Sequence, residues 1–294
     1  MKTQGIIKIE GKELGPIVGI MGICHGNEGV GKIALDFLRN FFKTNELKRG
    51  TLYLIEGNQK AFKENTICID NNLNRIFVEE ENMPEDIVYD GYEYARQKEL
   101  KPILEELDFF LDIHAANKKS PPFSITTESD DLSIKLAKIM PVDFFSYAWD
   151  DYIKGTTIQW VEKHGGTGIT IECGDTNSEN EKEIAIEASK IFLKYLGLYD
   201  FMDVKIKDKD KCLTLIRKEP VINKDSFDYV KNFENFDIVK SGELIAEDSE
   251  KKYIATNGGN SKTEEFVIVF PTNVDFIRTG AIKEAYLLGE FKLF

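Results

Sequence analysis

The stretch IVGIMGICHGNEGVGKIALDFLRNFF, residues 17–42, contains two apolar patterns of different period, separated by a glycine-rich turn. Its first part, Ile17 to Ile23, is a short continuous apolar run of the length expected for a buried strand. Its last part, Gly31 to Phe42, places apolar residues three or four positions apart, which is typical of a helix with one buried face. A strand, a turn and a helix in this order are typical of an α/β fold.

The same alternation of apolar runs and helical segments continues along the chain to about Leu198. We expect further strands at Thr51 to Ile55, Phe109 to Ile113, Phe123 to Thr126 and Gly168 to Ile171. We expect further helices at Tyr92 to Leu107 and Glu181 to Leu196. This pattern predicts an α/β fold with a mixed, largely parallel sheet flanked by helices.

The character of the sequence changes after about Asp200, where helical periodicity fades. Short β-type runs separated by polar turns follow at Cys212 to Ile216, Phe236 to Val239, Tyr253 to Ala255 and Phe266 to Phe270. We therefore predict a catalytic domain over residues 1–203 and a smaller, β-rich C-terminal domain over residues 204–294. The second domain is expected either to shape the mouth of a pocket or to build the subunit interface of a homo-oligomer.

Composition and charge exclude several classes of protein. The net charge of -13 and the lack of a basic block argue against nucleic acid as a partner. The four cysteines form no CxxC pair, so neither a disulfide framework nor a cysteine zinc knuckle is indicated. No stretch reaches the roughly 18 apolar residues of a membrane span. We expect a cytoplasmic protein that does not associate with membranes.

The chain has only three histidines, and two of them follow predicted strands. His25 and His114 stand where residues distant in sequence can converge, because loops at the carboxyl ends of strands build the ligand site of an α/β sheet. Glu28 lies three residues after His25. Two imidazoles and one carboxylate form the His₂Glu ligand set of a catalytic zinc ion. The structural alternative is that His25 and Glu28 cap a helix and His114 is a hydrogen-bonded core residue.

Four motifs carry a family resemblance. They are HGNE at 25–28, NNLNRIF at 71–77, LDIHAA at 111–116 and ITIECG at 169–174. In this order they resemble the succinylglutamate desuccinylase and aspartoacylase family, relatives of the zinc carboxypeptidases. The resemblance covers roughly residues 15 to 200 and extends more loosely into the β-rich tail.

The resemblance implies a role for each matching residue. His25, Glu28 and His114 would hold one Zn²⁺ per chain, and Glu172 would be the catalytic general base and acid. Such a carboxylate takes a proton from the attacking water and later protonates the leaving amine. Asn74 and Arg75 would bind the carboxylate of the substrate, because a guanidinium offers two parallel donors and the amide adds a third.

The chain departs from the family pattern at three positions. Ile67 and Asn72 stand where the family has an Arg and an Asp in a stretch resembling TRYIDxDLNR. The family Arg polarises the scissile carbonyl, and the loss of such a donor costs about 10² to 10³ in rate. Glu162 stands near the place of the Arg with which aspartoacylases grip the aspartate side chain, so N-acetylaspartate is not the expected substrate.

These observations favour a zinc-dependent amidohydrolase that cleaves an N-acyl amino acid or a similar small amide carrying a carboxylate. Two alternatives remain open. The first is a carboxypeptidase-like enzyme that trims peptides. The second is a zinc-containing protein that binds a small carboxylate and has weakened catalysis, which the missing Arg at Ile67 motivates.

Overall fold

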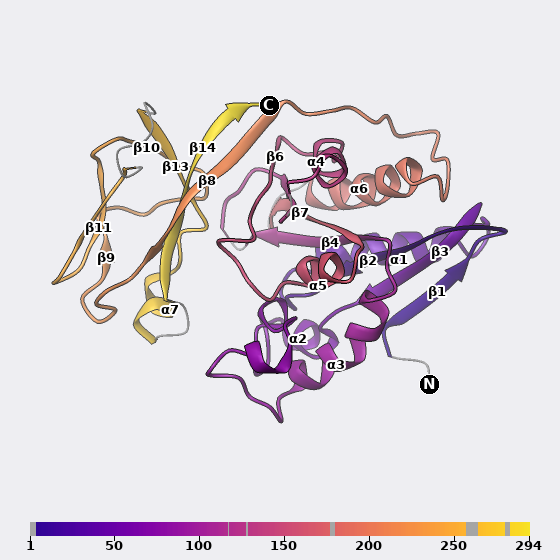
Figure 1. The fold of residues 1–294 in the computed structure, drawn as a ribbon, viewed down its shortest axis with the longest axis horizontal. Coiled ribbons are helices and arrows are strands. Elements are labelled where there is room, and N and C mark those ends of the chain that lie inside the picture. Colours follow the sequence, from indigo (N-terminus) through magenta and orange to yellow (C-terminus); the bar gives the residue numbers. More distant parts are fainter. Residues whose placement is uncertain (1–3, 117, 128, 177–179, 257–263, 280–282) are drawn as a thin grey trace. The chain divides into compact units, whose positions relative to one another are not determined.

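The computed structural model describes residues 4–116, 118–127, 129–176, 180–256, 264–279 and 283–294 of the chain (Figure 1). The chain divides into two compact units, one formed by residues 1–117 and 121–209 and the other by residues 118–120 and 210–294. The sequence-based division lies between residues 203 and 204, whereas the compact units meet in the chain between Lys209 and Asp210.

The first unit contains a mixed sheet in the strand order β1-β3-β2-β4-β7-β5-β6. Its strands are β1 (Ile6–Glu10), β2 (Glu13–Gly22), β3 (Arg49–Glu56), β4 (Phe109–Ala116), β5 (Phe123–Ile125), β6 (Phe144–Ser146) and β7 (Thr167–Asp175). β2 pairs in parallel with both β3 and β4, and β4 pairs in parallel with β7. β1 and β5 run antiparallel to β3 and β7, respectively. The predicted mixed, largely parallel sheet is therefore confirmed.

Helices cover both faces of this sheet (Figure 1). They are α1 (Val30–Phe41), α2 (Gln59–Glu64), α3 (Tyr92–Leu104), α4 (Asp131–Lys138), α5 (Thr157–Lys163) and α6 (Glu181–Tyr195), with 3₁₀ turns η1 (Leu73–Arg75) and η2 (Glu80–Asn82). Successive residues of a strand point to opposite faces, so Ile20 packs in the core under α1 and α6, while Met21 packs in the core under α3 and α5.

The second unit is built mainly from strands. β8 (Lys211–Pro220), β14 (Glu284–Leu293), β13 (Glu265–Val269) and β10 (Ile238–Lys240) are adjacent and antiparallel, and β12 (Lys252–Ile254), β11 (Leu244–Glu247) and β9 (Asp228–Tyr229) form a second, three-stranded sheet. The second unit has a core of its own, which contains aromatic side chains such as Phe227, Tyr253 and Tyr286. It also contains α7 (Val274–Thr279). The predicted β-rich character of the C-terminal part is confirmed.

The first unit differs from the expectations in several details, since α2, α4, α5 and β6 also had no counterpart among the expected elements. Helix α3 ends at Leu104 rather than Leu107, with Pro102 in its last turn. β1 was not predicted, because it is an edge strand whose residues are mostly exposed and therefore form no apolar run. Among the described residues, no helix has the length and apolarity needed to cross a membrane.

Candidate metal centre and substrate site

The candidate site lies at the carboxyl ends of the parallel strands. β2 ends at Gly22, and the turn that leads from it into α1 carries His25 and Glu28. His114 is near the end of the neighbouring strand β4 and pairs in register with Glu172 on β7. Because β4 and β7 are parallel, paired residues project to the same face of the sheet. Three motifs that are far apart in sequence therefore meet at one edge.

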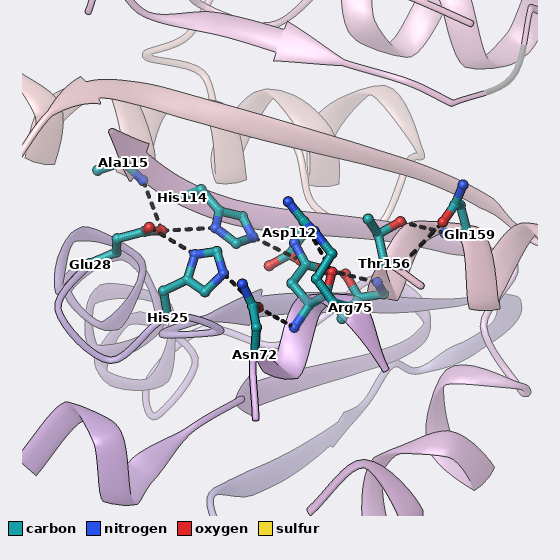
Figure 2. A network of polar contacts seen from close by, with 11 residues as sticks. His25, Glu28, Asn72, Arg75, Asp112, His114, Ala115, Thr156 and Gln159 are labelled. Carbon is teal, nitrogen blue, oxygen red and sulfur yellow. Dashed lines mark hydrogen bonds and ion pairs between the residues drawn. The ribbon is translucent and has the colours of Figure 1, made fainter. Parts of the chain in front are cut away.

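The three predicted metal ligands converge. His25 Nδ1 lies 2.8 Å from Glu28 Oε1, and His114 Nδ1 lies 2.8 Å from Glu28 Oε2 (Figure 2). One donor atom from each of the three residues falls within 4.8 Å of the other two. Glu28 and His114 are buried, and His25 is half-buried. The arrangement gives a compact ligand set with two imidazoles and one carboxylate.

The outer nitrogen of each imidazole faces an acceptor. His25 Nε2 lies 3.1 Å from Asn72 Oδ1, and His114 Nε2 lies 3.0 Å from Asp112 Oδ2 (Figure 2). Asn72 Oδ1 also accepts the backbone N–H of Asn74 at 3.0 Å, which fixes the oxygen end of this amide toward the site. The hydrogen bond to Asn72 favours the tautomer of His25 in which Nδ1 carries the free lone pair, as a metal ligand requires.

Electrostatic attraction shifts the pKa values of Glu28 and His114 in opposite directions. Burial would raise the pKa of Glu28, but attraction to His25 and His114 outweighs it and lowers that pKa. Burial would lower the pKa of His114, but Asp112 and Glu28 outweigh it and raise that pKa well above its usual value. The imidazole of His114 thus lies beside Glu28 in a position where positive charge is favoured, which is also the environment that a metal cation prefers.

A second group of donors is less suited to a metal. Cys24, Asp112 and His114 also have ligand atoms within 4.8 Å of one another. Burial, with a further contribution from Asp112, raises the pKa of Cys24 to about 12. The thiol therefore keeps its proton, and the thiolate that a metal needs is disfavoured. His25, Glu28 and His114 are the better candidates among the described residues.

Glu172 has the electrostatic environment of a group that exchanges a proton. Burial raises its pKa to about 8, and repulsion from Glu28 and Asp112 adds to this against the attraction of His114 and Arg75. A carboxyl group with such a pKa gains and loses a proton near neutral pH.

Asn74 and Arg75 are connected to the candidate site through Asn72 and Glu172. Asn74 is buried in η1 and its Oδ1 accepts the backbone N–H of Thr157 at 3.0 Å. This bond turns the Nδ2 donors of the amide away from Thr157. Arg75 is exposed and donates to the Asn74 carbonyl at 2.6 Å. Attraction from the exposed guanidinium of Arg75 opposes the rise in the pKa of Glu172.

The sequence of residues 14–197 matches the succinylglutamate desuccinylase/aspartoacylase catalytic domain. The chain belongs to this family. The match covers more than half of the chain and includes every residue of the candidate site. It confirms the resemblance seen in the four motifs and places the chain among hydrolases that act on amide bonds as deacylases. No curated protein matches the sequence.

Several solved structures share the fold. Succinylglutamate desuccinylase from Vibrio cholerae is 17% identical with a TM-score of 0.75, over 98% of this chain and 85% of the other. Murine aminoacylase 3 is 16% identical with a TM-score of 0.66, over 96% and 97%. The product-bound ectoine utilization protein EutE (DoeB) from Ruegeria pomeroyi is 19% identical with a TM-score of 0.63, over 97% and 88%.

The ligand chemistry of the candidate centre fits the zinc ion associated with the desuccinylase/aspartoacylase family. His25, Glu28 and His114 provide the His₂Glu set of a catalytic zinc site, which leaves room for a further ligand. The contacts at His25 Nε2 and His114 Nε2 resemble the outer shell that orients zinc-binding imidazoles.

The structure also shows the contacts of the three residues that depart from the family pattern. Ile67 lies beside the loop that carries His25 and Glu28, where its carbonyl accepts the N–H of Gly26 at 3.1 Å, but its side chain has no donor to replace the family Arg. Asn72, at the position of the family Asp, contacts His25 as a neutral acceptor. Glu162 accepts a hydrogen bond from Thr127.

Two residues that support the site are not recognisable from the sequence. Thr157 joins Asn74 to Asp112, and nothing in its local pattern distinguishes it from an ordinary residue at a helix start. Glu93 of α3 is fully buried and accepts hydrogen bonds from the backbone N–H groups of the loop that precedes η1. A charged residue among the apolar positions of a helix was the only available signal, and it does not identify the partner.

Proposed function

We propose that this chain is a zinc-dependent amidohydrolase that cleaves the amide bond of an N-acyl amino acid or a similar small amide carrying a carboxylate. The observation that supports it best is the convergence of the two histidines and Glu28, with Glu172 in register beside His114. His25, Glu28 and His114 would hold one Zn²⁺ per chain. When bound, the ion would polarise the scissile carbonyl and make a water molecule more acidic.

Residues of the chain would then transfer the proton and bind the substrate. Glu172 would accept a proton from the attacking water and transfer it to the nitrogen of the leaving amine, since its raised pKa allows both steps near neutral pH. Arg75 and the Nδ2 donors of Asn74 would bind the substrate carboxylate. Glu162 offers a carboxylate where aspartoacylases carry an Arg, which argues against N-acetylaspartate.

The test is amine release by zinc-loaded protein from a panel of N-acyl amino acids, with acyl and amino-acid parts varied independently. Glu172→Gln keeps the size of the side chain and removes its proton exchange, so we expect it to bind zinc and to lose about 10² to 10⁴ in kcat. Short peptides of equal size in the same panel test the carboxypeptidase-like alternative. Faster cleavage of these peptides than of every acyl amino acid would contradict the proposal.

A second candidate function follows from Ile67. Without the family Arg, the chain would be a zinc-containing protein that binds a small carboxylate with weakened catalysis. Zinc-loaded protein that binds acyl amino acids through Arg75 and turns none of them over would favour this function over the hydrolase.

A further inference from the structure

Thr157 occupies a distinctive place at the start of α5. It is completely buried, yet its N–H and its hydroxyl are directed to residues of the candidate site. The preceding Thr156 forms a capping box with Gln159, in which each side chain accepts a hydrogen bond from the backbone N–H of the other residue (Figure 2). The capping box fixes the first turn of α5, so the helix start does not need the side chain of Thr157.

Two contacts fix the backbone from which the Thr157 hydroxyl projects. Its N–H donates to Asn74 Oδ1 at 3.0 Å. The neighbouring Gly155 has φ +75°, and a side chain there would bring a Cβ within 2.3 Å of the Arg75 carbonyl oxygen. The close approach of these two segments holds Thr157 against η1.

The hydroxyl of Thr157 donates to Asp112 Oδ2 at 2.5 Å. Asp112 is completely buried, and its other oxygen has no hydrogen-bond partner among the described residues. The same Oδ2 lies 3.0 Å from His114 Nε2. Asp112 therefore has one neutral donor that sets the position of its carboxylate, and this carboxylate faces the outer nitrogen of His114.

We propose that Thr157 is a positioning residue of the metal centre, which acts through Asp112 to hold His114 in the orientation that binds the metal. The inference rests on the metal part of the proposed function and not on its substrate. Outer partners of metal-binding histidines typically change metal affinity by about 10-fold to 100-fold. Thr157 is one residue further out, so we expect an effect near the lower end of this range.

The test compares zinc affinity, measured by chelator competition, in full-length variants. Thr157→Val keeps the shape and the N–H but removes the hydroxyl, and we expect zinc to bind about 10-fold more weakly. Thr157→Ser keeps the hydroxyl and should restore affinity. Thr126→Val is the matched control, because Thr126 is also completely buried and its hydroxyl has no hydrogen-bond partner among the described residues. A purely structural role would lower thermal stability without changing zinc affinity.

A double-mutant cycle separates action through Asp112 from an independent effect. Asp112→Asn should itself weaken zinc binding, and adding Thr157→Val to it should cost less than Thr157→Val costs in the wild type. Equal costs in both backgrounds, or Thr157→Val binding zinc as tightly as Thr126→Val, would overturn the inference. If the wild-type protein binds no zinc at all, the proposed function fails first, so the two failures are distinguishable.

Discussion

The charge state of Glu172 links the fold to the proposed chemistry. In the metal-free protein, burial and the repulsion of Glu28 and Asp112 raise its pKa to about 8. The same carboxyl in an unfolded chain has a pKa of about 4.3. Between these values the folded protein holds a proton that the unfolded chain releases. The contribution of this group to stability is therefore complete below the unfolded pKa and is lost as the pH rises through the folded pKa.

Glu172→Gln cannot titrate, so it provides the reference for this effect. Between pH 5 and pH 8.5, the free energy of unfolding of the metal-free wild type should fall by on the order of 2 kcal/mol relative to that of metal-free Glu172→Gln. This is less than the full pKa shift would give, because Glu172 is partly exposed and solvent screens its charge. Urea unfolding of both proteins at several pH values measures it. Parallel stability profiles would show that the carboxyl of Glu172 titrates as in water.

Asn72 sets the environment of His25 with a neutral acceptor, whereas Asp112 offers His114 a charged one. Asn72→Asp retains an oxygen for His25 Nε2 and for the Asn74 N–H but adds charge, which makes the imidazole a stronger ligand. We expect zinc affinity to rise by up to about 10-fold, and to fall by a similar factor in Asn72→Ala, which has no acceptor. Chelator competition measures both. Unchanged affinity in both variants would mean that Asn72 does not orient His25.

At the scale of elements, α3 supports the loop that leads into η1. Glu93 accepts the N–H groups of Ile69, Asp70 and Asn71 at 2.7, 2.9 and 3.0 Å and the Nδ2 of Asn58 at 2.9 Å. A buried carboxylate that accepts four donors is stable only because the donors point at it. The loop, and with it the place of Asn74, depends on one side chain of a distant helix.

Glu93→Gln places an NH₂ group against some of these N–H donors and leaves them unsatisfied. We expect the free energy of unfolding to fall by about 2 to 4 kcal/mol, measured by urea denaturation at pH 7. The control is Glu64→Gln on α2, an exposed residue without a partner in the described structure, which should change stability by less than about 0.5 kcal/mol. Equal effects of the two substitutions would contradict the role of Glu93.

At the scale of the whole molecule, the two compact units have separate cores, and all candidate metal ligands belong to the first unit. A ligand that binds only the native state stabilises it by about 4 kcal/mol at a concentration 1,000 times its Kd. Zinc should therefore slow amide hydrogen exchange in β2 and β4, which carry or precede the ligands, and leave β11 and β12 unchanged. Mass-spectrometric exchange with and without zinc tests this, and equal slowing in both units would contradict it.

The amino-acid sequence was sufficient to predict the central strands, three of the helices and the residue types of the site. The apolar run Ile17 to Ile23 and the helical period of Gly31 to Phe42 correspond to β2 and α1, because the period of burial is a local property. The positions of His25 and His114 after apolar runs predicted that they meet, since parallel strands end at one edge. The family motifs added Glu172, Asn74 and Arg75.

The surroundings of these residues become known only from the three-dimensional packing. Thr157 contacts Asp112 and Asn74 across 45 and 83 positions of the chain, and Glu93 reaches residues 22 to 35 positions away. The pKa of about 8 at Glu172 likewise results from burial and from charges contributed by other strands and loops. The packing of helices on the sheet brings such partners together, and a local sequence pattern does not show which distant residues will meet. The sequence therefore identifies the candidate site residues, whereas packing determines their orientation and their charge.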